Sequence, residues 1–121
     1  MRFVVHEHHA THLHWDLRLE LDGMLKSWAV PKEPPTEAGI KRLAIAVEDH
    51  SLDYIDFEGI IEEGYGKGTV KIWDEGTFEV ESRKANKIVF RLQGKKLGGK
   101  YTLLKFEKAG ENQWLFFKAK E

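Results

Sequence analysis

Residues 13–30 read Leu13-His14-Trp15-Asp16-Leu17-Arg18-Leu19-Glu20-Leu21-Asp22-Gly23-Met24-Leu25-Lys26-Ser27-Trp28-Ala29-Val30. Apolar and polar side chains alternate here with a period of two, which is typical of β-strands. Asp22-Gly23 is a two-residue turn signal. The stretch therefore predicts a β-hairpin whose first strand packs Trp15, Leu17 and Leu19 into a core and presents polar side chains on its other face.

The two-residue turn also fixes which residues of the hairpin face each other. The cross-strand neighbours of the polar row are then small residues, which leaves room for a substrate beside that row. On the other face the pairs are large and apolar, as a core layer requires. The expected pairs are Trp15 with Val30, Asp16 with Ala29, Leu17 with Trp28, Arg18 with Ser27, and Glu20 with Leu25.

The rest of the chain shows the same strand pattern, interrupted by glycine and proline. A run at 43–47 that is apolar on both faces predicts a central strand, and residues 36–42 could form a short helical turn. Frequent glycine turns and about nine strands predict an all-β fold, either a closed or nearly closed barrel with little helix, or a sandwich. The further expected strands are 55–61, 69–73 and 77–81 around a turn at Asp74-Glu75-Gly76, 87–92, 101–106 and 113–118.

Length and composition set limits on the class of protein. The 121 residues, 41% of them apolar, predict one domain over 1–121 with a core of its own. The absence of cysteine excludes disulfides, a thiolate nucleophile and cysteine-ligated metals. No signal peptide or membrane-spanning run is evident, so we expect a cytoplasmic protein that does not contact membranes.

Charge is distributed unevenly although the net charge is only −1. Residues 1–82 contain 8 Lys or Arg against 17 Asp or Glu, a net charge of −9; residues 83–121 contain 11 against 3, a net charge of +8. This asymmetry suggests an acidic part that attracts cations and a basic part that attracts phosphates. Plain solvation of basic strand faces explains it equally well.

Histidines are concentrated at the N-terminus, where five of the six lie between positions 6 and 14. His14 and Asp16 point the same way from one strand and together make a bidentate grip on a divalent metal. His8 needs only a small bend near Ala10-Thr11 to become the third ligand. Arg18 lies in register beside them. The ordinary alternative is a solvated strand face. His6 shares the parity of His8, and His9 and His12 are expected to lie in a loop without a role.

A second polar cluster follows the strand at 43–47. It reads Glu48-Asp49-His50, with Tyr54 close behind. His50 could act as a fourth metal ligand, as a hydrogen-bond donor to a phosphate, or as a general acid. The ordinary alternative is a histidine at a strand end whose hydrogen bonds are satisfied. Glu48 could orient the imidazoles.

Two further segments have weaker signals. Lys32 and Arg42 flank the proline loop and could clamp phosphate oxygens. The segment Gly64–Gly68 could cradle a phosphate with its backbone N–H groups, although short glycine turns are far commoner.

Several of these motifs together are familiar. His8 followed by residues 14–23 and 25–32 resembles the phosphoesterase domain of bacterial and archaeal DNA ligase D. The similarity continues through residues 47–50, 52–54, 57–59 and 70–76, and covers roughly residues 3–120. A match of this length with separate motifs in order is highly specific.

The resemblance implies a function and a site. Members of that family are manganese-dependent enzymes that repair 3′ ends in end joining, and their fold is a β-barrel of about eight strands. They remove a terminal 3′ ribonucleoside and then the 3′ phosphate. Co²⁺ or Zn²⁺ are alternative metals. The family's metal ligands fall on His8, His14 and Asp16. Its catalytic side chains fall on Arg18, Glu48, His50 and Tyr54, and its phosphate-binding side chains on Arg18, Lys32, Arg42 and His50.

The chain also departs from the family pattern. Glu33 replaces the glycine of Val-Pro-Lys-Gly, the loop at Glu63-Gly64-Tyr65 is one residue shorter, and the chain starts almost at its first strand, where bacterial members carry an N-terminal arm. The phosphatase step is therefore the firmer expectation. We expect a monomer that acts on nucleic-acid 3′ ends, with a DNA ligase and polymerase acting in trans.

Two other functions compete with this one. A non-haem Fe(II) oxygenase could use His14, Asp16 and His50 as a facial triad. A nucleic-acid-binding or metal-binding module without catalysis is the second alternative.

Overall fold

The computed structural model describes residues 1–64 and 67–121. In this part of the chain the backbone forms antiparallel strands and two short 3₁₀ helices. No helix in the same part has the length and apolar character needed to cross a membrane. The elements are β1 Arg2–His9, β2 Leu13–Leu21, β3 Met24–Val30, β4 Lys41–His50, η1 Leu52–Asp56, β5 Gly59–Ile61, β6 Gly68–Lys84, β7 Lys87–Gly94, β8 Gly98–Lys105, η2 Glu107–Ala109 and β9 Gln113–Lys118.

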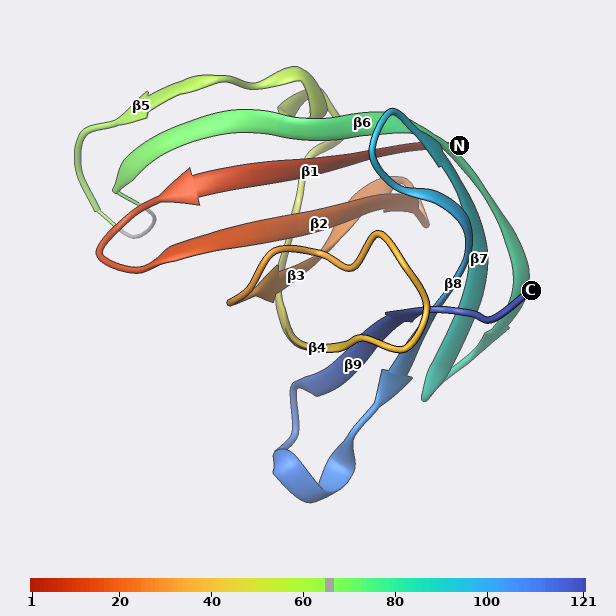
Figure 1. Ribbon diagram of the computed structural model, residues 1–121. Helices are drawn as coiled ribbons and strands as arrows, with labels where there is room; N and C mark the ends of the chain where they lie inside the picture. Colours follow the sequence, from red (N-terminus) through yellow and green to blue (C-terminus); the bar gives the residue numbers. More distant parts are fainter. Residues whose placement is uncertain (65–66) are drawn as a thin grey trace.

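Eight of the strands form a closed barrel (Figure 1). Hydrogen bonds connect the strands in the order β1-β2-β3-β4-β9-β8-β7-β6, and pairing of β1 with β6 closes the circle. β6 is long enough to pair with β1 through residues 69–77 and with β7 through residues 76–84. β5 adds a ninth strand on β6. The predicted closed all-β barrel is confirmed, and the sandwich is excluded.

The β2–β3 hairpin has the expected register in full. All five predicted pairs occur, from Trp15 opposite Val30 to Glu20 opposite Leu25. At the turn, Asp22 has φ 56° and Gly23 has φ 77°. Two consecutive residues with positive φ are the mark of a type I′ turn, whose twist matches that of the strands.

The turn predicted at Asp74-Glu75-Gly76 is wrong, because β6 runs through it as one strand. Gly76 serves another purpose: a Cβ there would overlap the backbone of Gln93 on β7. Asp74 is buried, and its carboxylate accepts hydrogen bonds from backbone N–H groups of the β7–β8 turn, including Leu97 N at 2.8 Å. Both turn-type residues are therefore fixed by contacts with distant parts of the chain.

Two smaller expectations also need correction, and a third is confirmed. Residues 36–42 form a bend and a turn before β4 rather than a helical turn. Residues 55–61 divide into the end of η1 and the three-residue β5. The central strand predicted at 43–47 is confirmed, because β4 lies between β3 and β9, although Leu43 on its outer face is 38% exposed.

The barrel wall buries side chains on both of its faces around β1, β2 and β3. The interior holds the main core, and aromatic rings from β6 to β9 fill its centre. On the outside, the segment after β4 crosses over these strands on its way to β5 (Figure 1), and Ile55 of η1 packs there on Val4 and Leu25. The main core contains Phe3, Val5, Leu17, Leu19, Leu21, Trp28, Val30, Ala44, Phe78, Ile88, Phe90, Leu92, Leu97, Tyr101, Leu103, Trp114 and Phe116.

Candidate metal centre

The polar row of the hairpin lies on this outer face, next to the crossing segment. His8 of β1 is directly opposite His14 of β2, and His6 is opposite Asp16. The strand alternation that sends Leu17 and Leu19 into the barrel sends Asp16 and Arg18 outward. Because η1 covers that side, these outward side chains are nevertheless buried; Asp16 is 5% and Arg18 4% exposed.

The predicted metal ligands His8, His14 and Asp16 come together. One donor atom from each lies within 4.8 Å of the others. Asp16 Oδ2 is 3.5 Å from His8 Nδ1 and 3.4 Å from His14 Nε2. Two imidazoles and one carboxylate are a ligand set for a divalent transition metal, with coordination positions left open for water or substrate.

The hydrogen bonding of His14 supports a cation at this point. Its Nδ1 lies 3.0 Å from the carbonyl oxygen of His12. A carbonyl only accepts, so Nδ1 carries the proton, and a neutral His14 presents the lone pair of Nε2 to Asp16. Two acceptors facing each other need a positive charge between them. Fixing of a metal-bound histidine by a backbone carbonyl is a common arrangement in metal sites.

The pKa values of the pair agree with that geometry. The hydrogen bond with Asp16 raises the pKa of His14 above its usual value, against the effect of burial. Burial by itself would raise the pKa of Asp16, but the hydrogen bond from His14 and the charge of Arg18 bring it below the usual value. The carboxylate is therefore ionised at neutral pH, and either a proton or a metal ion can occupy the position beside His14 Nε2.

Arg18 is held on several sides at once. Its Nε donates to His6 Nδ1 at 3.0 Å, and one Nη donates to Ser27 Oγ at 2.8 Å. Its other Nη is 3.3 Å from Asp16 Oδ2, and its guanidinium lies over the Tyr54 ring at 5.0 Å. The sequence indicated Ser27 only as a small neighbour of Arg18 and left His6 open. The sequence carried no signal for the pairing of β1 with β2, which places His6 opposite Asp16 and beside Arg18 on the same face.

Three aromatic rings close the other side of the site. His50 stacks on Tyr54 with ring centroids 4.7 Å apart, and Tyr54 stacks on Phe57 at 5.0 Å. Burial and the charge of Arg18 lower the pKa of His50, so its ring is neutral near pH 7. Among the described residues, His50 does not belong to the cluster of metal donors, which disfavours the oxygenase triad.

A pocket of about 490 Å³ opens over the site. Seven of the nine residues predicted to function line it. Lys32 and Arg42 do not, and Arg42 Nε instead donates to the backbone oxygen of Glu33 at 2.8 Å. The predicted residues in the lining are His8, His14, Asp16, Arg18, Glu48, His50 and Tyr54.

Two described residues of the glycine-rich segment contribute to this pocket. Gly64 and Lys67 both line it, and Lys67 is a cation that the sequence analysis did not single out. The phosphate cradle predicted for Gly64–Gly68 includes Tyr65 and Gly66, which lie outside the described residues.

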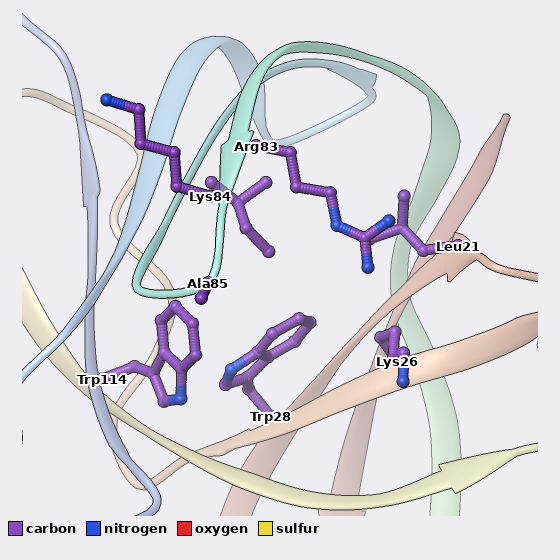
Figure 2. A pocket seen from close by; sticks show the side chains of 8 residues that line it. Leu21, Lys26, Trp28, Arg83, Lys84, Ala85 and Trp114 are labelled. Carbon is purple, nitrogen blue, oxygen red and sulfur yellow. The ribbon is translucent and has the colours of Figure 1, made fainter.

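A second pocket of about 440 Å³ is lined by residues that include Leu21 and Ala85 (Figure 2). Its wall includes Trp28 and Trp114, whose rings meet edge to face. These indoles are only 5% and 9% exposed. Lys26 and Arg83 at the rim already pair with Asp49 and Asp22. This pocket therefore borders the core. The converging metal donors His8, His14 and Asp16 line the other pocket.

Comparison with known proteins identifies the family. The model of the DNA ligase D 3′-phosphoesterase domain matches residues 6–105. The chain belongs to this family. The match spans the hairpin, the metal donors, the aromatic stack and the glycine-rich segment. The resemblance noted from the motifs is therefore confirmed over most of the chain.

Curated relatives of this phosphoesterase domain are much longer proteins. The chain is 47% identical to the multifunctional non-homologous end joining protein LigD of Pseudomonas aeruginosa over 128 aligned residues, which cover 100% of the chain and 15% of that protein. It is 42% identical to the multifunctional non-homologous end joining DNA repair protein LigD of Mycobacterium tuberculosis, covering 98% and 16%. The chain thus spans about a sixth of the length of these relatives.

Proposed function

We propose that this domain is a Mn²⁺-dependent phosphoesterase that heals 3′ ends of nucleic acid, removing a 3′ phosphate and, before it, a terminal 3′ ribonucleoside. One observation carries the proposal: the donors of His8, His14 and Asp16 converge beside a buried arginine in an open pocket. Together they would provide a bound metal ion and a fixed positive charge, both of which stabilise negative charge on a phosphoryl group. The family and the end-joining names of the relatives supply the substrate class.

The protein side chains divide the remaining work. His8, His14 and Asp16 would hold the divalent metal, which when bound would act as a Lewis acid and lower the pKa of a bound water. Arg18 neutralises negative charge on the phosphoryl oxygens. The neutral His50 ring offers one N–H to the same oxygens or to the leaving 3′ oxygen; acting as an acid requires a further proton, which a bound anion favours. The Tyr54 ring lies against the Arg18 guanidinium and stacks on the His50 ring, so it keeps both side chains in place.

The product of the reaction suggests what acts next. Removal of the phosphate leaves a 3′-OH, which is the group that a polymerase extends and a ligase joins. We therefore place the domain before these two activities in end joining.

Phosphate release from a defined end tests the proposal. The substrate is a 5′-labelled primer with a 3′ phosphate, annealed to a template and incubated with Mn²⁺, Co²⁺, Zn²⁺ or EDTA. We expect Mn²⁺-dependent conversion to a 3′-OH and its loss in His14→Ala. His9→Ala is the matched control, because His9 is a neighbouring histidine whose exposed side chain pairs with Glu7 outside the site. A primer ending in one ribonucleotide tests the ribonucleoside step.

Two outcomes would overturn the proposal. One is no metal-dependent release by the wild type, and the other is equal release by His14→Ala. Oxygen uptake with Fe²⁺ would instead favour the oxygenase. Binding of the primer without turnover in the presence of any of the three metals would favour a non-catalytic module.

A further inference from the structure

His6 has no place in the mechanism so far, yet it is completely buried beside the site. It lies on β1 opposite Asp16 and shares the outward face of His8. Among the described residues it is not one of the converging metal donors. A fully buried polar side chain in a folded protein is retained for a partner, and the partner here is Arg18.

The contact between the two side chains has only one possible polarity. A guanidinium donates and never accepts. Because Arg18 Nε lies 3.0 Å from His6 Nδ1, Nδ1 carries the lone pair and the proton resides on Nε2. His6 therefore acts as a neutral acceptor toward a permanent cation. The edge-to-face contact with Tyr54, at 5.2 Å between centroids, fixes the plane of the His6 ring.

Ser27 makes the same kind of contact on another edge of the guanidinium. Its Oγ accepts from Arg18 at 2.8 Å and donates to the backbone oxygen of Leu25 at 3.1 Å. With Asp16 at 3.3 Å, three of the five N–H groups of Arg18 face protein acceptors. The other two have no protein acceptor among the described residues, and Arg18 lines the pocket.

The neutrality of His6 and Ser27 as acceptors matters. Asp16 already places one carboxylate beside Arg18. A second carboxylate in the place of His6 would orient Arg18 equally well, but its added negative charge would compete with an incoming phosphate. An imidazole nitrogen and a hydroxyl hold the guanidinium in one orientation and add no negative charge to that of Asp16, which lies 3.3 Å away. Such fixed orientation is the property that lets a cation stabilise charge developing in a transition state.

We propose that His6 is a positioning residue that, together with Ser27, aims the Arg18 guanidinium at the phosphoryl group of the substrate. The inference rests on the proposed function for the identity of that group. It predicts that loss of the acceptor at position 6 impairs the use of phosphate esters and leaves metal binding unchanged.

Three variants test it. His6→Leu removes the acceptor, whereas His6→Asn places an amide oxygen near the position of Nδ1. Ser27→Ala removes the second acceptor and serves if His6→Leu fails to fold. We expect His6→Leu to lower kcat/KM for 3′-phosphate release by about 10²-fold, with Mn²⁺ affinity within about twofold of wild type. His6→Asn should recover activity to within about tenfold. A merely structural role would impair both variants alike.

NMR of the arginine side chains provides a readout that does not depend on activity. The Nε–H signal of Arg18, assigned by its absence in Arg18→Lys, should be protected from exchange in wild type and His6→Asn and lost in His6→Leu. Broadening of the ³¹P line of inorganic phosphate by Mn²⁺ should be weaker in His6→Leu. If the wild type releases no phosphate, the proposed function fails, but these two measurements still decide the role of His6.

The inference is overturned in either of two cases. One is His6→Leu with kcat/KM within about threefold of wild type and the Arg18 signal retained. The other is His6→Asn as impaired as a folded His6→Leu.

Discussion

The two faces of β1 and β2 are separated by one backbone thickness and differ in chemistry around Asp16 and Arg18. The inner face consists of apolar side chains such as Phe3, Val5 and Leu17, all fully buried. The outer face is equally inaccessible around Asp16 and Arg18, but there burial encloses charges and imidazoles. Burial alone therefore does not distinguish a core from a site in this molecule.

The difference lies in how buried groups are satisfied. Apolar side chains gain stability from burial itself, at about 25 cal/mol per Å². Buried charges lose hydration free energy, and hydrogen bonds or ion pairs must offset that loss. For Arg18 these partners are His6, Ser27 and Asp16. The outer face is thus organised for electrostatics, and substitutions on the two faces of one strand should affect different properties.

Asp16→Asn should produce the largest effect. The substitution removes the negative charge that His8 and His14 face, and with it the anionic metal ligand, while the side-chain volume stays nearly the same. We expect phosphate release to fall by at least about 10³-fold, equivalent to several kcal/mol of transition-state stabilisation. Gel assays and Mn²⁺ titration measure it, with circular dichroism as the check on folding. Retained Mn²⁺ affinity would contradict the assignment of the ligand.

Leu17→Ala, at the very next residue, should affect stability instead. Its side chain is fully buried in the barrel, and such truncations cost about 2–5 kcal/mol. Urea unfolding measures the change. At urea concentrations below the unfolding transition, the Mn²⁺ affinity and the activity per folded molecule should match those of the wild type. Loss of metal binding by the folded variant would mean that the two faces are not independent.

Tyr101 provides a smaller, pH-dependent test of the interior. Its hydroxyl donates to the backbone oxygen of Pro35 at 2.8 Å, and burial raises its pKa to about 12 from a model-compound value of 10.0. The folded state holds the Tyr101 proton to a higher pH than the unfolded state does. The contribution of Tyr101 to the free energy of unfolding is therefore complete below pH 10 and is lost as the pH rises toward 12. The loss should reach about 2–3 kcal/mol.

Tyr101→Phe is the control for that pH dependence. It should lose about 1 kcal/mol at pH 7 with the hydrogen bond and then show a flatter decline in unfolding free energy between pH 10 and 12. Identical profiles for the two proteins would assign the alkaline loss to other groups.

His9→Ala should have the smallest effect. The side chain is about half exposed and pairs with Glu7 at 2.7 Å, and exposed pairs contribute little. Stability should change by less than about 0.5 kcal/mol and activity should be unchanged. A large loss of activity would extend the site beyond the outer face around Asp16.

Features of the fold set by neighbouring residues could be predicted from the sequence. The β2–β3 register follows from a two-residue turn and strict alternation, so every predicted pair is present. The segment Asp74-Glu75-Gly76 could not be interpreted in this way. Its composition indicates a turn, whereas its real determinants are the backbone of Gln93 and the N–H groups of the β7–β8 turn, about twenty residues away.

The candidate site divides along the same line. The pattern His14-x-Asp16-x-Arg18 by itself determined that these side chains share a face, because alternation in a strand is a local property. Barrel closure, η1 crossing the outer face, and the acceptors His6 and Ser27 around Arg18 were decided only by tertiary structure, as was the distance of Lys32 and Arg42 from the pocket. Such contacts join residues far apart in the chain, and no local periodicity encodes which of them will meet.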